Sequence, residues 1–328
     1  MKLPRRNLLH LAAGATALVM SRAAGAQAYP SRPIRLVVPF PPGGVFDALA
    51  RPWVEQVKPL LGTIIVENIG GGGSSLGAAA VARARPDGYT ILLGGTLPHV
   101  NETLLKSRPL YDPVKDLYPI AGLAVTALAL AVHPSVPAQN LKEFVAHAKT
   151  HAGTLSYAHA GVGATSQLIG EMFKLQAGLP DLVQVPYRGA GPAITDLISG
   201  QVAMAVVAVT GQSLEFHRSG KLRILAVTSP KRLIAAPELP TVADAGFPGL
   251  TSHNTIGPVA PAGTSKPIIE LITQAVRQAL AEPAYEQKLI DSGFEASLDT
   301  APEEFRRRLE ADIAFWTPVV EALGLRID

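Results

Sequence analysis

The sequence predicts a mixed α/β fold, and three observations support this prediction. Short apolar runs alternate with amphipathic stretches, which is the pattern of repeated strand–helix units. Glycine-rich segments stand where an apolar run gives way to an amphipathic one. The 328 residues are 48% apolar and 17% charged, a composition that supports a large core and excludes a disordered chain.

The periodicity assigns each element in order. Strands are expected at residues 34–40, 64–66, 90–93, 128–133, 155–158, 202–207, 222–227 and 255–259. Helices are expected at residues 46–61, 75–84, 141–151, 166–177, 193–199, 266–281 and 302–323. Proline-rich segments at 107–119 and 230–248 suggest boundaries between two lobes. We expect lobe 1 to comprise residues 29–126 and 250–328 and lobe 2 to comprise residues 127–249, so that two crossings form a hinge.

The first 28 residues are predicted to be a cleaved signal peptide. Lys2, Arg5 and Arg6 form a basic start, residues 8–20 are apolar, and Ala26-Gln27-Ala28 is a cleavage site. The apolar run is too short for a helix that spans a membrane. The Arg5-Arg6 pair fits a twin-arginine signal, and a Sec signal fits as well. The mature protein is therefore expected in a bacterial periplasm.

Charge and cysteine content exclude several function classes. Four of the 29 basic residues and none of the 26 acidic residues lie in positions 1–28, which leaves 25 basic against 26 acidic residues. This balance removes the electrostatic case for nucleic-acid binding. With no cysteine, the chain has no disulfide, thiolate metal site or cysteine nucleophile. The histidines are scattered, so neither a metal site nor a cofactor is expected.

Two glycine-rich segments are candidate binding loops. Phe40-Pro41-Pro42-Gly43-Gly44 precedes the helix that carries Asp47, and the segment from Ala160 to Ser166 precedes the helix at 166–177. Amides at a helix start are unpaired and attract a carboxylate or phosphate. In the second segment, Thr165 or Ser166 fits either a helix N-cap or a ligand contact. Arg188 follows a strand and could face the cleft or solvent.

A third glycine-rich segment, residues 70–77, offers an alternative of another class. Gly73-Ser74-Ser75-Leu76-Gly77 matches the G-x-S-x-G pattern of serine esterases, with Ser75 as nucleophile. However, that serine should follow its strand directly, and residues 67–72 intervene. A flexible loop capped by Ser74 or Ser75 is the favoured interpretation.

Together these motifs resemble the Bordetella uptake gene family, the periplasmic solute-binding receptors of tripartite tricarboxylate transporters. The resemblance covers nearly the whole mature chain. It rests on YPSRPI (29–34), VPFPPGG (38–44) with Asp47, VEN (66–68), PDGY (86–89), YDPVKD (111–116), HPS (133–135), VPYRG (185–189), LAVTS (225–229), PTV (240–242) and APAGT (260–264).

The resemblance implies a type II periplasmic binding-protein fold, with two α/β lobes around a ligand cleft and no catalysis. It implies a receptor that captures a small carboxylate and delivers it to membrane subunits of the transporter. An anion site with an apolar wall favours an acid of the aromatic-acid or dicarboxylate class, and a monomer is expected. The implied ligand contacts are Phe40, Pro42, Gly43, Gly44, Ala160, Gly161, Gly163, Thr165 and Ser166.

Three positions depart from the family pattern that the resemblance implies. Val45 and Ala164 stand where relatives usually carry a hydroxyl. Val207 stands where amino-acid-binding relatives carry an aspartate that can hold an ammonium group. The implied cleft is therefore less polar than the family norm, and an amino acid is not the expected ligand.

Overall fold

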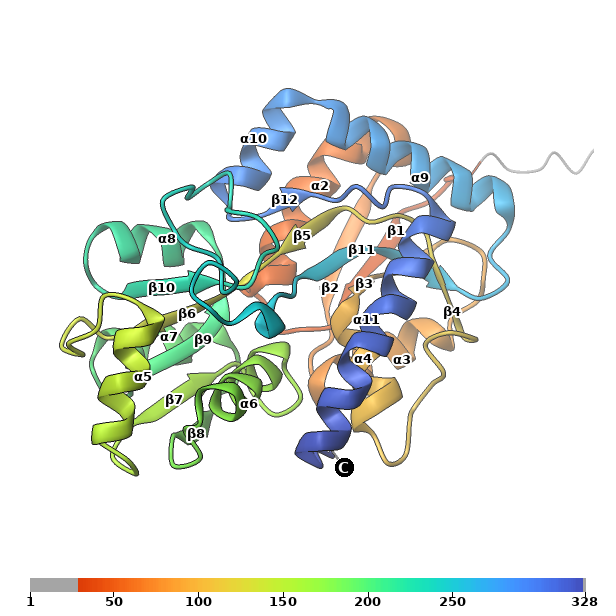
Figure 1. The fold of residues 1–328 in the computed structure, drawn as a ribbon. Helices are drawn as coiled ribbons and strands as arrows, with labels where there is room; N and C mark the ends of the chain where they lie inside the picture. The colour runs from red at the N-terminus through yellow and green to blue at the C-terminus, as the bar shows by residue number, and fades with distance from the viewer. Residues whose placement is uncertain (1–28, 327–328) are drawn as a thin grey trace, which may run out of the picture. The chain divides into compact units, whose positions relative to one another are not determined.

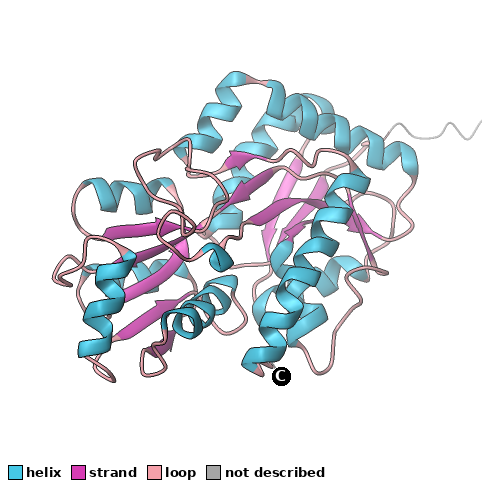
Figure 2. Cartoon of the chain, in the orientation of Figure 1, coloured by secondary structure: helices cyan, strands magenta, loops and turns pink. Residues whose placement is uncertain are grey.

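The computed structural model describes residues 29–326, so the predicted signal peptide lies outside the described residues. Residues Arg32–Asp328 form one compact unit. This unit contains two separate β-sheets, and helices pack on both of them (Figure 1; Figure 2). The predicted α/β class is therefore confirmed.

The first sheet is mixed. Its strands are β1 (Ile34–Val38), β2 (Ile64–Asn68), β3 (Thr90–Gly95), β4 (Leu117–Pro119), β5 (Ala124–Thr126), β11 (Asn254–Pro261) and β12 (Glu295–Ala296). The strand order is β12-β5-β11-β3-β1-β2, and β4 also pairs with β11. β1 is parallel to both β2 and β3, whereas β11 is antiparallel to β3 and β5. β1 is almost continuously apolar because it is central and covered on both faces.

The second sheet contains the middle of the chain. Its strands are β6 (Leu128–Val132), β7 (Ser156–His159), β8 (Val183–Pro186), β9 (Met204–Ala208) and β10 (Arg223–Val227), in the order β10-β6-β9-β7-β8. β7 is parallel to β8 and β9. The chain enters this sheet between β5 and β6 and returns to the first sheet between β10 and β11.

Helices follow many of the strands. They are α2 (Val45–Leu61), α3 (Ser75–Ala82), α4 (Thr96–Val100), α5 (Leu141–Thr150), α6 (Thr165–Ala177), α7 (Ala190–Ile198), α8 (Gly211–Arg218), α9 (Lys266–Ala281), α10 (Pro283–Asp291) and α11 (Pro302–Leu323), with short 3₁₀ turns η1 (Gly72–Ser74) and η3 (Pro248–Leu250) and a π turn η2 (Asn101–Leu105). Among the described residues, no helix is both long and apolar enough to span a bilayer.

The second sheet has apolar clusters on its two faces because successive side chains of a strand point to opposite sides. Along β9, Met204 and Val206 belong to one cluster, and Ala205 and Val207 belong to the other. The first cluster also contains Trp316 and Val320 of α11. The last helix therefore packs into the core of the second sheet, although it follows the last strand of the first.

The strands and helices expected from periodicity are all present, with ends that differ by a few residues. The elements missed are β4, β5, β8 and β12 and the helices α4, α8 and α10. Most of these strands are too short to show an alternating pattern. The three helices span at most nine residues, too few to establish a helical period.

Candidate functional site

The first candidate loop connects β1 to α2 and is mostly exposed. Pro42, Gly43 and Gly44 are exposed, and Val45 is half-buried. The ring of Phe40 is half-buried and packs against Phe46, with 4.6 Å between ring centroids. Gly43 has a φ of +79°, and a Cβ there would meet no atom within 4 Å. Glycine is therefore required for backbone conformation and leaves open space above the chain.

Asp47 closes part of this helix opening. Its Oδ2 accepts a hydrogen bond from the Gly43 amide (3.1 Å) and one from Arg51 Nε (2.9 Å). Burial raises the pKa of Asp47, but the hydrogen bonds from Arg51, Gly43 and Asn68 outweigh burial and hold the pKa below its ordinary value. The Gly43 amide, which precedes the N-cap residue Gly44, is therefore already paired within the loop. The amides of Gly44 and Val45 remain at the start of α2, where a helix supplies no partner.

The second candidate loop connects β7 to α6 and repeats this geometry. The Gly163 amide donates to Gln167 Oε1 (2.8 Å), four residues later, as Gly43 does to Asp47. Gly161 and Gly163 have φ values of +130° and +81°. Ala160 and Ala164 are half-buried. The amides of Ala160, Gly161, Gly163 and Ala164 all donate within this region, so the amides left without a helical partner are those of Thr165 and Ser166 at the start of α6.

Thr165 and Ser166 do not cap α6. Ala164 is the N-cap residue, and no side chain caps the helix. Ser166 Oγ instead accepts a hydrogen bond from the Ala160 amide (3.0 Å). Thr165 Oγ1 accepts one from Asn254 Nδ2 (3.1 Å). The N-cap alternative is therefore wrong, because the N-cap position falls at Ala164, before both hydroxyl residues.

The third glycine-rich segment lies between the two loops. Gly70 abuts Pro41, since a Cβ on Gly70 would come within 2.9 Å of the proline ring. A Cβ on Gly73 would lie 3.9 Å from the Val162 carbonyl oxygen. The third segment therefore lies against the first and close to the second, although their sequence positions are far apart.

The arrangement of Ser75 differs from that of an esterase nucleophile. β2 ends at Asn68, and the turn η1 intervenes before Ser75 begins α3. Ser75 is 1% exposed, and its hydroxyl donates to the buried carboxylate of Glu102. Ser74 occupies the N-cap position of α3, as predicted, but its side chain makes no capping hydrogen bond.

Arg188 and Val207 occupy contrasting surroundings. Arg188 is exposed, and its neighbours along the chain bond to the second loop: Tyr187 N donates to His159 O (3.0 Å) and Gly189 N donates to Ala160 O (3.0 Å). Arg188 thus lies beside the second loop. Val207 is 1% exposed and packs in an apolar cluster of the second sheet. Both remain predicted ligand contacts.

Sequence reasoning missed several polar residues of this region. Asn68 Nδ2 donates to Phe40 O (3.0 Å), and Gln167 Nε2 donates to Gln184 Oε1 (2.9 Å). Asn101 Nδ2 donates to Gly73 O (2.6 Å), and its Oδ1 is buried without a partner among the described residues. A signal was available for Gln167, which stands four residues after a glycine at a helix start, as Asp47 does.

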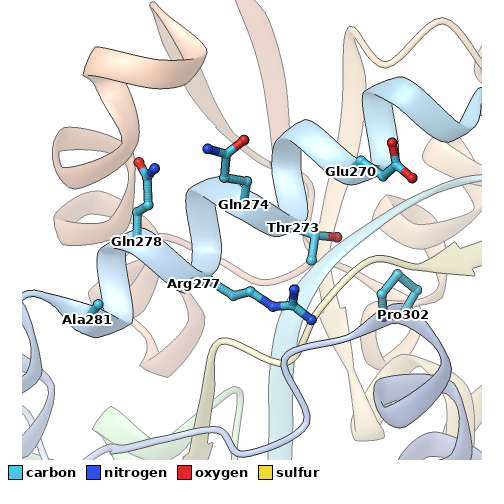
Figure 3. A pocket seen from close by; sticks show the side chains of 7 residues that line it. All are labelled: Glu270, Thr273, Gln274, Arg277, Gln278, Ala281 and Pro302. Atoms are coloured by element: carbon cyan, nitrogen blue, oxygen red, sulfur yellow. The ribbon is translucent and has the colours of Figure 1, made fainter.

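Elsewhere, a surface cavity of about 430 Å³ lies beside α9 (Figure 3). None of the predicted ligand contacts lines it. Arg277, which lines it, donates from Nε to the Thr300 carbonyl (3.1 Å). No group of three or more metal-ligating side chains occurs among residues 29–326.

Comparison with known proteins identifies the family. A family model described as the tripartite tricarboxylate transporter family receptor matches residues 49–325. The chain belongs to this receptor family. The receptor is 33% identical over 305 residues to protein BugT of Bordetella pertussis, an alignment that covers 92% of each chain. The predicted membership of the Bordetella uptake gene family is thereby confirmed.

Two solved structures resemble the receptor throughout its length. Rpa4515 of R. palustris with adipate is 31% identical, with a TM-score of 0.85 over 91% of this chain and 99% of that one. MatC of Rhodopseudomonas palustris with bound malate is 31% identical, with a TM-score of 0.81 over 89% of this chain and 100% of that one. The predicted two-lobed periplasmic binding-protein fold is confirmed, and receptors of this family are periplasmic solute-binding proteins.

Proposed function

We propose that the mature protein is a periplasmic receptor that captures a small carboxylate of the dicarboxylate or aromatic-acid class. The proposed contacts are the backbone of Phe40 to Val45 and that of Ala160 to Ala164, with the hydroxyls of Thr165 and Ser166. Arg188, beside the second loop, supplies a cation. The captured acid is delivered to the membrane subunits of the transporter.

The observation that carries this proposal is that the same arrangement occurs twice. At α2 and at α6, a glycine-rich loop leads from a strand into the start of a helix, and each such helix start is called an opening. Each opening follows a parallel strand, β1 or β7, and ligands of α/β folds bind at the carboxyl ends of such strands. In each opening one glycine amide bonds to a side chain four residues later. The amides of Gly44 and Val45 at α2, and those of Thr165 and Ser166 at α6, stand where a helix supplies no partner, whereas the Ala164 amide donates to Gly161 O (3.1 Å). Amides at a helix start bind carboxylates through their positive dipole end.

Two relatives support the dicarboxylate class. The structures of Rpa4515 and MatC contain adipate and malate, both dicarboxylates. Aromatic acids stay in the proposed ligand class because Val45 and Ala164 stand where relatives usually carry a hydroxyl. Both openings are therefore less polar than in those relatives. Amino acids are not expected, because Val207 offers no charge and the Asp47 carboxylate is already paired with Arg51.

Capture involves closure of two lobes, which we propose to comprise residues 29–126 with 250–328, and residues 127–249. A carboxylate that contacts both openings favours the closed arrangement through contacts that the open one lacks. The protein acts as a monomer, which sedimentation of the mature chain tests. A dimer at micromolar concentration contradicts this part of the proposal.

Thermal shift with defined acids tests the proposed ligand class. The mature chain from Tyr29 is mixed with adipate, malate or benzoate, and in parallel with adipamide, malamide or benzamide. A ligand at 100 times its Kd stabilises the fold by about 2.7 kcal/mol, which raises Tm by several degrees. We expect at least one acid to raise Tm and its amide to have no effect. An acid and its amide that bind equally well by calorimetry overturn the proposal.

A further inference from the structure

Asn254 lies where the chain returns from the second sheet to the first. It is the first residue of β11, and it pairs in register with Thr126, the last residue of β5. β5 leads directly into β6, so this residue pair joins both connections between the sheets. Any movement of one sheet relative to the other must bend these two connections. The Asn254 side chain is attached to one of them.

The Asn254 side chain reaches the start of α6 in the second candidate loop. Its Nδ2 donates to Thr165 Oγ1 (3.1 Å), and the two residues are 7% and 3% exposed. An amide nitrogen can only donate, so the Thr165 oxygen is the acceptor in this bond. The Thr165 hydroxyl keeps its own proton, and among residues 29–326 it donates no hydrogen bond.

The position of Asn254 is itself held by a further set of hydrogen bonds. The amide of the next residue, Thr255, donates to Thr96 Oγ1 (3.0 Å), and the Thr96 hydroxyl donates to Asp312 Oδ2 (2.5 Å). All three residues are buried. The start of β11 is therefore tied to α11, which fixes the backbone from which the Asn254 side chain extends.

We infer that Asn254 is a positioning residue that directs the Thr165 hydroxyl proton towards the ligand carboxylate. This inference rests on the proposed function, because it requires a carboxylate at the second opening. An oxygen that accepts from Asn254 donates its proton in another direction. The proton then meets the anion without the cost of reorienting a free hydroxyl. The affinity for the ligand therefore depends, through Thr165, on the position of the first residue of β11.

Replacement of Asn254 by aspartate reverses the direction of the bond. The aspartate can only accept, so the Thr165 proton turns towards it and away from the ligand. With the acid of the panel above that binds best, we expect N254D to weaken affinity by roughly 30-fold or more by calorimetry. N254A removes only the hydrogen bond that orients the Thr165 hydroxyl, and we expect it to weaken ligand affinity roughly 3- to 10-fold. T165S keeps the hydroxyl and binds within about threefold of the wild type.

The effect through Thr165 is separated from simple charge repulsion by a double-mutant cycle. In the T165V background, N254D retains only the repulsion, so its fold-change must be smaller than in the wild type. Asn140→Asp makes the same chemical change at the exposed N-cap of α5 and should leave affinity unchanged. Equal effects of N254D in both backgrounds, or an N254D variant that binds like the wild type, overturn the inference.

A measurement without ligand distinguishes this inference from the proposed function. Urea unfolding of N254A, T165V and the double variant measures their coupling, which we expect to be at least about threefold in the unfolding constant. Binding of no acid in the panel contradicts the proposed function and, with it, the orientation role. Absence of coupling overturns the inference alone, since the proposed function does not need Asn254.

Discussion

The backbone amide of Gly163 donates to the side-chain oxygen of Gln167 at 2.8 Å. The Gly43 amide makes the corresponding bond to Asp47 Oδ2 at 3.1 Å, in the loop that follows β1 of the first sheet. The two openings differ in charge, because Asp47 is anionic and paired with Arg51, whereas Gln167 is neutral and bonded to Gln184. An anion at the second opening therefore meets no negative charge from this side chain.

Gln167→Glu should weaken binding of the carboxylate without disturbing the loop. Glutamate retains an acceptor for the Gly163 amide but adds a negative charge beside the proposed ligand carboxylate. Two like charges about 6 Å apart repel by about 2 to 3 kcal/mol at an effective dielectric constant of about 20. We expect a loss of affinity of roughly tenfold or more by calorimetry. Gln201→Glu, on an exposed turn, is the control, and equal affinities of Q167E and wild type would contradict the prediction.

Asp312 should make the fold less stable as the pH rises. Burial raises the pKa of Asp312 to about 6, and the hydrogen bond from Thr96 and the charge of Arg308 only partly oppose this. A folded pKa above the unfolded value stabilises the protein below about pH 4, and this contribution disappears as the pH rises through 6. Asp312→Asn should therefore be more stable than wild type at pH 7.5, by up to about 3 kcal/mol.

Urea unfolding of both proteins between pH 4 and 8 measures this difference. The two curves should converge near pH 4, where Asp312 is protonated in the folded state. A constant difference across this range would show that Asp312 does not titrate in the way proposed.

Ser75→Ala should destabilise the fold and leave ester hydrolysis unchanged. Glu102 is fully buried and accepts hydrogen bonds from Ser75 and from the Leu110 amide. Removal of a donor from a buried acceptor costs about 1 to 3 kcal/mol, measured as a lower urea midpoint. Ser219→Ala, at an exposed site, should change stability by less than about 0.5 kcal/mol. Hydrolysis of p-nitrophenyl acetate by wild type that disappears in S75A would instead support the esterase alternative.

Amino acids should bind more weakly than the matching acids without an amino group. A buried ammonium that lacks an acidic partner costs several kcal/mol. Val207 is apolar, and Asp47 already accepts bonds from Gly43 and Arg51. Glutarate should therefore bind at least tenfold more tightly than glutamate, and succinate more tightly than aspartate. The reverse order in calorimetry would require an acidic side chain at the ligand.

The sequence determined the α/β class, most strands and helices, and the two helix openings. These features depend on periodicity and on glycine at specific turns, which are local properties of the chain. The motif set was also sufficient to recognise the family. The prediction that Thr165 or Ser166 caps α6 was wrong, because the backbone dihedral angles at Ala164, and not the residue type, decide where this helix begins.

Only the tertiary structure decided which residues meet across the fold. Thr165 and Asn254 are 89 positions apart, and no local pattern pairs them. The glycine run at 70–73 was predicted to be a flexible loop. In the structure the run packs against Pro41 and stands close to Val162, with φ values from +59° to +131° between Gly71 and Gly73. The physical reason is that a hydrogen bond or contact requires proximity, and proximity between distant residues exists only after the sheets have formed and packed.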